Sequence, residues 1–421
     1  MKNYDVAVIG GGFSGLYSAL LCAEKGLNTV VIANGIGKIL FEDGIIDLLG
    51  YYDNNVISDP LGYIDNLPKE HPYSKINKNF IEKALTHFLN FTKQENYEYV
   101  TYNKNVWLPT IAGTFKPTFL IPKTFIPDTF KDQKEIIIVN FKRLKDFYPE
   151  LFVNNLMNIN DKYRNKDYKI VNIDMDIYFD RDINIVDLAN LLEHTEVQEY
   201  FAKKMATVIP KNSVVLLPQV FGTNSSYKYY DYLTNTLQAK IIEIIGMPPA
   251  SSGLRLYNLI NNKIKALGVS VINNAKVISS IVNDNKCVQI ETDILGKKIE
   301  YQAKYYILAT GGFYGGGLES KYPGEVLEPI FNLKIDKPVD YDKWTAELLE
   351  NSPQPYAKIG VKVNENLQPI NEAQQVLVDN VFVAGRNLSG FDPSYEKSNK
   401  GVSLASAYKI VSLIGEKING I

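Results

Sequence analysis

Cysteine is scarce in this chain, which has only Cys22 and Cys287 among 421 residues and no CxxC pair. Two thiolates are too few for a four-cysteine iron–sulfur cluster, so any such centre would have to belong to a partner protein. Histidine is nearly as rare. The three histidines are scattered and show neither the HxH nor the HExxH spacing of metal ligands. We therefore expect no metal site.

Charge of one sign and long apolar runs are also missing. Lysine and arginine total 45 against 47 aspartate and glutamate residues, a net charge of −2, and no basic run is interleaved with aromatic residues. Nucleic acid is therefore not an expected partner. No apolar stretch approaches the roughly 20 residues of a membrane helix, and residues 1–4 lead into an apolar run without a signal peptide. We expect a cytoplasmic protein without direct membrane insertion.

What the chain does contain is a glycine pattern near its start. Gly10, Gly12 and Gly15 form a GxGxxG motif between Val6–Ile9, which predicts a buried strand, and Leu16–Glu24, which predicts a helix. In this context the first glycine allows a tight turn, the second lets the backbone approach a pyrophosphate, and the third lets the helix pack on the strand. The helix N-terminus then faces the phosphate. A turn without a ligand is the simpler alternative.

The next predicted strand, Thr29–Ile32, ends without the acidic residue that binds a ribose hydroxyl in dinucleotide folds. Ala33 and Asn34 stand at this point instead. The Asn34 side chain can accept a hydrogen bond from a ribose, although without the strength of a carboxylate. Because FMN does not need that carboxylate, the sequence favours FMN, with FAD as the alternative.

Two further glycine-containing segments follow apolar strands late in the chain. Residues 305–308 lead into Thr310–Gly312, and a second apolar run leads into Gly385–Arg386, which Gly401 and a predicted helix over 402–409 follow. A strand that ends in glycine beside a helix N-terminus can hold a phosphate or the pyrimidine edge of a flavin. Together the three segments indicate a flavoprotein with two dinucleotide-binding domains, whereas an NAD-binding Rossmann domain explains only the first.

The predicted fold class is α/β, a Rossmann-like FAD/NAD(P)-binding flavoprotein fold with an inserted α+β domain. Short apolar strands between residues 269 and 292 indicate that the nucleotide-binding sheet resumes near residue 250. Inside the insertion, the patterns predict strands over 136–139 and 214–217 and helices over 150–157 and 186–205. The expected domains are a flavin-binding domain of residues 1–50, 250–330 and 355–421, and an inserted substrate or partner domain of residues 51–249 and 331–354.

An ordered set of further segments is more specific than the glycine motifs, which many flavoproteins share. The segments are Asp43–Leu49, His71–Ser74, Leu108–Thr114, Pro218–Gly222, Gly253–Leu256, Ala309–Phe313, Gly315–Leu318, Glu328–Ile330, Ala384–Gly385 and Gly390–Pro393. With them, the chain resembles the B subunit of the anaerobic glycerol-3-phosphate dehydrogenases over nearly its whole length. Ser398–Gly401 departs from the pattern because it is poor in glycine for a flavin loop.

The resemblance implies an FMN-containing flavoprotein, the B subunit of a complex that oxidises sn-glycerol 3-phosphate to dihydroxyacetone phosphate and passes electrons towards quinone. It implies two partners, an FAD-containing catalytic A subunit and an iron–sulfur, membrane-associated C subunit. Through such a partner the chain would be peripheral to the inner face of the membrane. The alternatives are a non-catalytic electron-relay or assembly subunit of that complex, and a stand-alone fumarate-reductase-like flavoprotein.

The motifs and the resemblance together assign a set of residues to cofactor binding. They are Gly10, Gly12, Phe13, Ser14, Gly15, Asn34, Gly44, Val277, Thr310, Gly311, Gly312, Gly385, Arg386 and Gly401.

Oxidation of a secondary alcohol needs a base for the hydroxyl proton while a flavin accepts the hydride. His71, in a predicted loop, is the candidate base. Arg255 is a candidate catalytic residue because a fixed guanidinium can clamp a phosphate, with an internal salt bridge as the alternative. Arg386 follows the third strand and is assigned to the flavin. His87 lies in an apolar helical pattern, which predicts a packed or surface residue.

Overall fold

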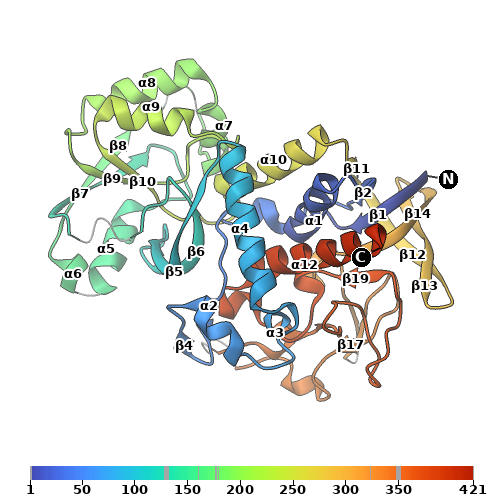
Figure 1. The fold of residues 1–421 in the computed structure, drawn as a ribbon. Coiled ribbons are helices and arrows are strands. Elements are labelled where there is room, and N and C mark those ends of the chain that lie inside the picture. Colours follow the sequence, from blue (N-terminus) through green and yellow to red (C-terminus); the bar gives the residue numbers. More distant parts are fainter. Residues whose placement is uncertain are drawn as a thin grey trace. The chain divides into compact units, whose positions relative to one another are not determined.

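The computed structural model describes residues 2–127, 132–159, 161–175, 178, 180–322, 324–347 and 352–420. The chain forms two compact units, each built from separate stretches of sequence (Figure 1). Unit 1 comprises Met1–Lys38, Asp47–Phe88 and Ile260–Ile421, and unit 2 comprises Ile39–Ile46 and Leu89–Leu259.

Unit 1 contains most of the strands. They are β1 (Lys2–Ile9), β2 (Thr29–Ile32), β3 (Tyr51–Tyr52), β4 (Asn55–Val56), β11 (Ser270–Ile272), β12 (Ala275–Asn283), β13 (Lys286–Ile294), β14 (Lys297–Leu308), β15 (Glu319–Lys321), β16 (Glu325–Leu327), β17 (Ile335–Asp336), β18 (Gly360–Val361) and β19 (Val381–Val383). Its helices are α1 (Phe13–Glu24), α2 (Pro60–Tyr63), α3 (Pro72–Ile76), α11 (Pro393–Glu396) and α12 (Asn399–Asn419). Two helices, α4 (Lys78–Gln94) and α10 (Ser251–Ala266), contain residues of both units.

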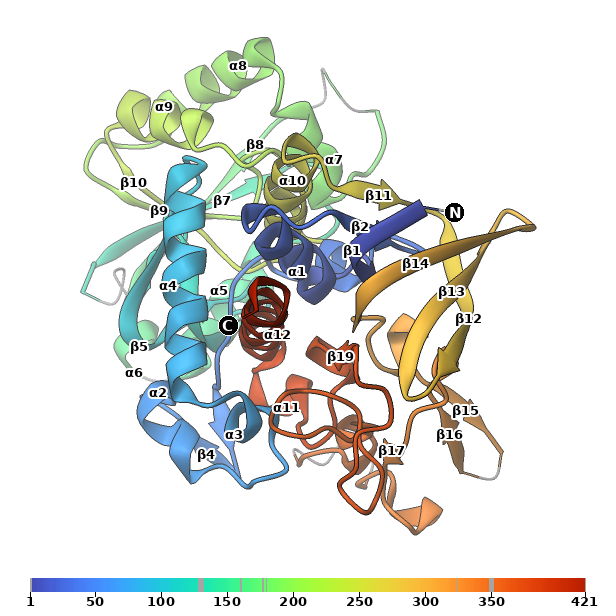
Figure 2. The same ribbon diagram turned by 45° about the vertical axis from the view of Figure 1, so that its right-hand side comes forward.

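The main sheet of unit 1 has the order β11-β2-β1-β14-β13-β12, with β19 beside β14. β1 runs parallel to β2 and β14, and β14 runs parallel to β19. Val6, Ala7 and Val8 on β1 are completely buried, as in a strand that is covered on both faces. α1 and α12 lie side by side in both ribbon views (Figures 1 and 2). The predicted Rossmann-like sheet is confirmed.

Unit 2 is organised around a second, four-stranded sheet. Its elements are β5 (Tyr99–Pro109), β6 (Phe115–Pro122), β7 (Glu135–Phe141), α5 (Pro149–Ile159), α6 (Asp161–Arg164), β8 (Asp167–Ile173), α7 (Ile185–Leu191), α8 (Thr195–Ala206), β9 (Val214–Leu217), α9 (Lys228–Leu237) and β10 (Lys240–Glu243). The sheet order is β10-β9-β7-β8 and every pairing is parallel. The sequence patterns did not reveal this parallel arrangement.

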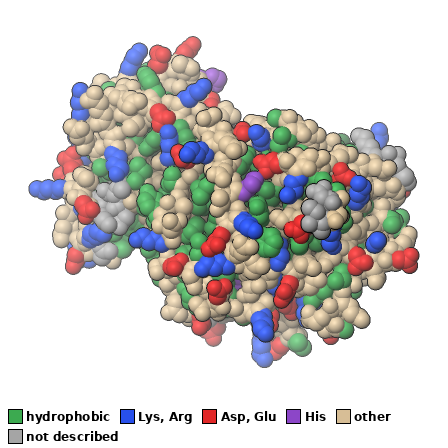
Figure 3. Space-filling view, viewed as in Figure 1, with side chains coloured by type: hydrophobic (Ala, Val, Ile, Leu, Met, Phe, Trp, Pro, Cys, Tyr) green, Lys and Arg blue, Asp and Glu red, His purple; other side chains and the backbone are tan. Residues whose placement is uncertain are grey.

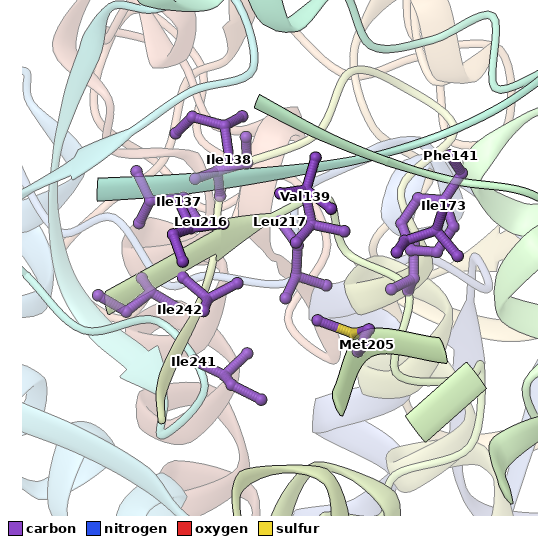
Figure 4. Packing of buried hydrophobic residues seen from close by; sticks show 14 of the residues in the cluster. Ile137, Ile138, Val139, Phe141, Ile173, Met205, Leu216, Leu217, Ile241 and Ile242 are labelled. Atoms are coloured by element: carbon purple, nitrogen blue, oxygen red, sulfur yellow. The ribbon is translucent and has the colours of Figure 1, made fainter. Parts of the chain in front are cut away.

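The core of unit 2 explains why its strands are so apolar. Ile136, Ile137, Ile138 and Val139 on β7 are all completely buried, so both faces of this strand are covered. Figure 4 shows Ile137, Ile138 and Val139 in one cluster with residues of β9 and β10 and with Met205 of α8. The predicted strands over 136–139 and 214–217 lie within β7 and β9. The predicted helix over 186–205 is two helices, α7 and α8, with a break between them.

Residues 51–88 and 331–354 differ from the expected domains, since the described parts of both belong to unit 1. The first range is held by α12, where the buried Lys409 ammonium donates to the carbonyl of Lys75 at 2.7 Å. The second contains β17, which pairs with β18. Neither contact joins residues close in sequence, so local patterns could not reveal them.

Residues 39–46, which we expected in the flavin-binding domain, belong to unit 2. Ile46 forms an antiparallel bridge with Leu120 at the end of β6. The hydroxyl of Tyr99 donates to the carbonyl of Gly44. These bonds attach the segment to the β5–β6 ribbon.

On one face of the molecule the two kinds of charge are mixed (Figure 3). On the face shown in Figure 3, lysine and arginine side chains are interspersed with aspartate and glutamate side chains. Over the described ranges, no helix is both long enough and apolar enough to cross a membrane.

Candidate functional site

The glycine loop after β1, called the cradle below, is tightly packed at two of its glycines and open at the third. Gly10 has φ +122°, and an added Cβ there would lie 2.2 Å from the carbonyl oxygen of Ala309. A Cβ on Gly15 would lie 2.1 Å from the carbonyl oxygen of Gly10. Gly12 differs, because a Cβ added there would meet no atom within 4 Å. Two glycines therefore let chain segments approach closely, and the third faces open space.

The N-terminus of α1 at this loop has no cap from a side chain. Gly12 is the N-cap residue, no side chain accepts from the first turn, and that turn contains no acidic residue. The first backbone N–H groups of a helix lack partners within the helix, and its positive end favours an anion. Phe13 is buried and stacks on Tyr17 at 5.9 Å, so its side chain packs inward. The helix end is thus available to a phosphate.

The other two predicted segments are bonded to each other by Asn387. Its side-chain oxygen accepts from the backbone N–H of Gly311 at 2.7 Å, and its side-chain nitrogen donates to the hydroxyl of Thr310 at 3.0 Å. Asn387 is completely buried. Sequence reasoning missed this residue, although a polar amide two positions after Gly385 was the available signal.

Gly385 brings its segment against the first helix. Its φ is +64°, and an added Cβ would lie 2.6 Å from the hydroxyl oxygen of Ser14 on α1. The backbone N–H of Gly385 donates to the hydroxyl of Ser406 on α12 at 3.0 Å. The structure therefore brings Gly10, Ser14 and Gly385 into one region of unit 1, at the carboxyl ends of β1, β14 and β19.

Arg386 places a cation beside these segments. Its guanidinium donates to the carbonyl oxygens of Ala357 and Ile359, the second at 3.3 Å, and its central carbon lies 5.7 Å from the ring centre of Phe391. An added Cβ on Gly312 would lie 3.3 Å from that carbon. Burial lowers the pKa of Arg386, and the charge of Asp392 opposes this shift. Among the described residues, no carboxylate lies within ion-pair distance of Arg386, which leaves its charge for a ligand.

The segment that follows β2 packs closely against the glycine loop. Asn34 is exposed, and the preceding Ala33 is held by backbone bonds to Ile272 and Ala275. Gly37 has φ +74°, and an added Cβ there would lie 2.8 Å from the Cα of Gly12. The side chain of Asn34 is therefore free to meet a ribose. Val277 is buried within β12 and lies in the sheet.

Gly44 and Gly401 have packing reasons for being glycine. A Cβ on Gly44, in unit 2, would lie 2.3 Å from the carbonyl oxygen of Ser252. A Cβ on Gly401, in the first turn of α12, would lie 2.2 Å from the hydroxyl oxygen of Tyr73. Their assignment to cofactor binding stays a prediction.

His71 does not have the surroundings of a base that meets substrate. It is completely buried, and its Nδ1 accepts from the backbone N–H of Tyr73 at 3.1 Å. Nδ1 therefore carries no proton, and Nε2, which lies 3.1 Å from the Glu396 carboxylate, donates to it. His71 caps α3 and orients Glu396. Its expected role as the catalytic base stays a prediction, and its burial and these bonds argue against it.

Arg255 has the internal ion pair that the sequence left as the alternative. Its guanidinium donates twice to Glu243, at 2.8 and 3.1 Å, and both side chains are completely buried. Burial lowers the pKa of Arg255, but the charge of Glu243 outweighs this and raises it. The ion pair occupies the guanidinium and argues against a clamp on a substrate phosphate, and the catalytic role of Arg255 stays a prediction.

The two thiols are buried and form no disulfide. Cys22 and Cys287 are both buried, and burial raises the pKa of Cys22 to about 12 and that of Cys287 to about 11. In the part of the chain that the structure describes, no three His, Cys, Asp or Glu side chains are placed to hold a metal ion.

Comparison with known proteins matches residues 5–402 to the model of a family described as an FAD binding domain. The chain belongs to this family. The match includes all three glycine-containing segments, so a flavin is the cofactor class that the cradle, the uncapped helix and Arg386 fit.

The chain is also similar to curated proteins over nearly its full length and theirs. The chain is 28% identical to the B subunit of the anaerobic glycerol-3-phosphate dehydrogenase of Aliivibrio fischeri (strain MJ11), covering 99% of this chain and 96% of that protein. It is also 28% identical to the protein of that name from Vibrio cholerae serotype O1 (strain ATCC 39315 / El Tor Inaba N16961), covering 98% and 97%. The expected family resemblance is thereby confirmed. Among solved structures, 3-ketosteroid Δ1-dehydrogenase from Sterolibacterium denitrificans aligns with a TM-score of 0.46 at 10% identity, covering 99% of this chain and 100% of that one.

Proposed function

We propose that the chain is the B subunit of a glycerol-3-phosphate dehydrogenase, a flavin-dependent oxidoreductase that acts on sn-glycerol 3-phosphate within a complex. The observation that carries the proposal is the full-length similarity to proteins named for this activity. The cradle in unit 1 supports it, because the site has the backbone geometry and the cation that a flavin phosphate or reduced flavin requires.

The cofactor we propose is FAD. The missing acid at Asn34 favours FMN, but the family match supports FAD, and the open space at Gly12 leaves room for a pyrophosphate. The exposed amide of Asn34 would then bind the ribose hydroxyl that a carboxylate binds elsewhere. FMN is the alternative that the experiment below separates.

The residues around the cradle have distinct parts in this proposal. A bound flavin would supply hydride acceptance. The N–H groups at the start of α1 would hold the phosphate, while Asn387 fixes Thr310 and Gly311. Arg386, oriented by two backbone carbonyls, would stabilise negative charge on the cofactor.

A second candidate function, electron relay or assembly without substrate oxidation, is favoured by a specific observation. Both residues that we expected to be catalytic, His71 and Arg255, are completely buried and already bonded to carboxylates. Under this alternative the hydride transfer takes place in a partner protein of the complex.

The proposed partners follow from the same resemblance. We propose an FAD-containing catalytic subunit and an iron–sulfur subunit at the membrane, with electrons passed towards quinone. The two cysteines of this chain are too few for a four-thiolate cluster, so a cluster on the electron path would lie in a partner.

The test is the absorption spectrum of the purified chain, supplied with FMN and FAD, before and after anaerobic addition of sn-glycerol 3-phosphate. The released cofactor is identified by mass. Bleaching of the flavin would show that this chain is catalytic. A flavin that stays oxidised until the FAD-containing partner is added would support the electron-relay function. A folded preparation that takes up no flavin would overturn the proposal, and recovery of FMN alone would overturn the choice of FAD.

A further inference from the structure

A cavity of about 260 Å³ lies within unit 1, apart from the glycine cradle residues. Three segments line it: the β3–β4 turn, residues 353–358 and α11. The lining residues are Tyr52, Asp53, Pro353, Lys358, Tyr395 and Glu396. The volume is just below the roughly 300–1,000 Å³ of pockets that hold drug-sized ligands, so there is room for a small metabolite and too little for a dinucleotide.

One wall of the cavity is a carboxylate with a fixed orientation. Glu396 is buried, and its Oε2 accepts from His71 at 3.1 Å and from the hydroxyl of Ser398 at 3.0 Å. Its Oε1 accepts from the backbone N–H of Asp392 at 3.0 Å. A carboxylate has about four acceptor positions, so these three bonds leave one unused among the described residues, on a side chain that lines the cavity. This gives the buried His71 a purpose, which is to position Glu396.

The remaining lining residues contribute both charges and two hydroxyl-bearing rings. Asp53 and Lys358 are exposed, and no ion pair of Lys358 occurs among the described residues. Tyr395 is held by Asn54, whose backbone N–H donates to its hydroxyl at 3.1 Å. The cavity thus combines one free cation with carboxylates that accept hydrogen bonds.

We propose that this cavity is a binding site for a small polyol phosphate, an inference that rests on the proposed function and assigns the substrate a place. Lys358 pairs with the phosphate, and the carboxylates of Asp53 and Glu396 accept from the hydroxyl groups. A ligand with a phosphate but no hydroxyl groups would leave the two carboxylates without a partner, and a polyol without a phosphate would leave Lys358 without one. The segment that bears Lys358 also supplies the carbonyls of Ala357 and Ile359 that hold Arg386, so the cavity and the cradle share a support.

The experiment measures binding of sn-glycerol 3-phosphate, glycerol and inorganic phosphate to the full-length, flavin-loaded protein by calorimetry. Lys358→Met and Asp53→Asn change exposed side chains, so the fold is kept, and Lys321→Met on β15 is the control for loss of a lysine. We expect Lys358→Met to weaken the binding of both sn-glycerol 3-phosphate and inorganic phosphate about tenfold, because one charge-assisted hydrogen bond is lost. Asp53→Asn should weaken the binding of sn-glycerol 3-phosphate but not that of inorganic phosphate. Lys321→Met should change the binding of neither compound.

The outcomes separate this inference from the proposed function. If the unaltered protein binds sn-glycerol 3-phosphate and both cavity variants bind it equally well, the site lies elsewhere and the proposed function stands. If the unaltered protein neither binds this compound nor transfers its electrons with the FAD-containing partner present, both are wrong. Equal weakening by the control variant would also overturn the inference, because the effect would then be one of net charge.

Discussion

Breaking the buried ion pair between Arg255 and Glu243 should destabilise unit 2 far more than removing both of its charges. Both side chains are completely buried and joined by two hydrogen bonds. Replacing Arg255 with methionine leaves the carboxylate buried without its cation, and such a loss costs about 3–5 kcal/mol. At about 2–4 °C for each kcal/mol in a unit of this size, the melting transition should fall by about 6–20 °C.

The double variant Arg255→Met/Glu243→Leu provides the internal comparison. With neither charge left, no uncompensated ion is buried, so most of the lost stability should return. The hydroxyl of Thr124, which donates to Glu243 at 2.6 Å, loses its partner, and this costs about 1 kcal/mol. Differential scanning calorimetry of the three proteins measures the transitions directly. A single variant that melts within about 2 °C of the unaltered protein would refute the reasoning.

The same variant decides between the structural and catalytic readings of Arg255. The variant Arg255→Met is assayed well below its melting temperature, in the complex that is active. It should bind flavin and reduce it at the rate of the unaltered protein. If a folded variant binds flavin but no longer reduces it at this rate, Arg255 has a catalytic role.

Three further predictions concern the cradle and the thiols. Gly12→Ala should lower flavin occupancy without lowering the melting temperature of the flavin-free protein, because its Cβ enters open space; equal occupancy would place the phosphate elsewhere. Asn387→Ala should cost about 1–3 kcal/mol in urea unfolding, since buried groups lose their partners; an unchanged midpoint would contradict this. At pH 8, Cys22 and Cys287 should stay protonated and react with a thiol reagent only after denaturation, as their raised pKa values and burial require; rapid labelling of the native protein would show that they are accessible.

Much of unit 1 could be predicted because its signals are local. The strand and helix on either side of the glycine motif follow from apolar runs, and Gly15 is dictated by its contact with Gly10 inside the motif. The apolar strands that end at Thr310 and Gly385 are equally local. What a local pattern did not reveal was the buried Asn387 that bonds one segment to the other.

The roles of the two expected catalytic residues could not be predicted from the sequence. His71 and Arg255 were chosen for their side-chain chemistry, but their roles depend on carboxylates that lie on other elements of the fold. The carboxylate of Glu396 is 325 positions from His71. No periodicity or spacing connects residues that far apart.

By itself, then, the sequence determined the Rossmann-like flavin fold and the family, because glycine spacing and apolar runs act over a few residues at a time. Only the tertiary structure decided which charges are paired, where residues 39–46, 51–88 and 331–354 belong, and that a cavity forms beside Glu396. Those features depend on burial and on contacts between distant segments. A side chain becomes a ligand contact, a positioning group or half of an internal ion pair according to what the fold places beside it.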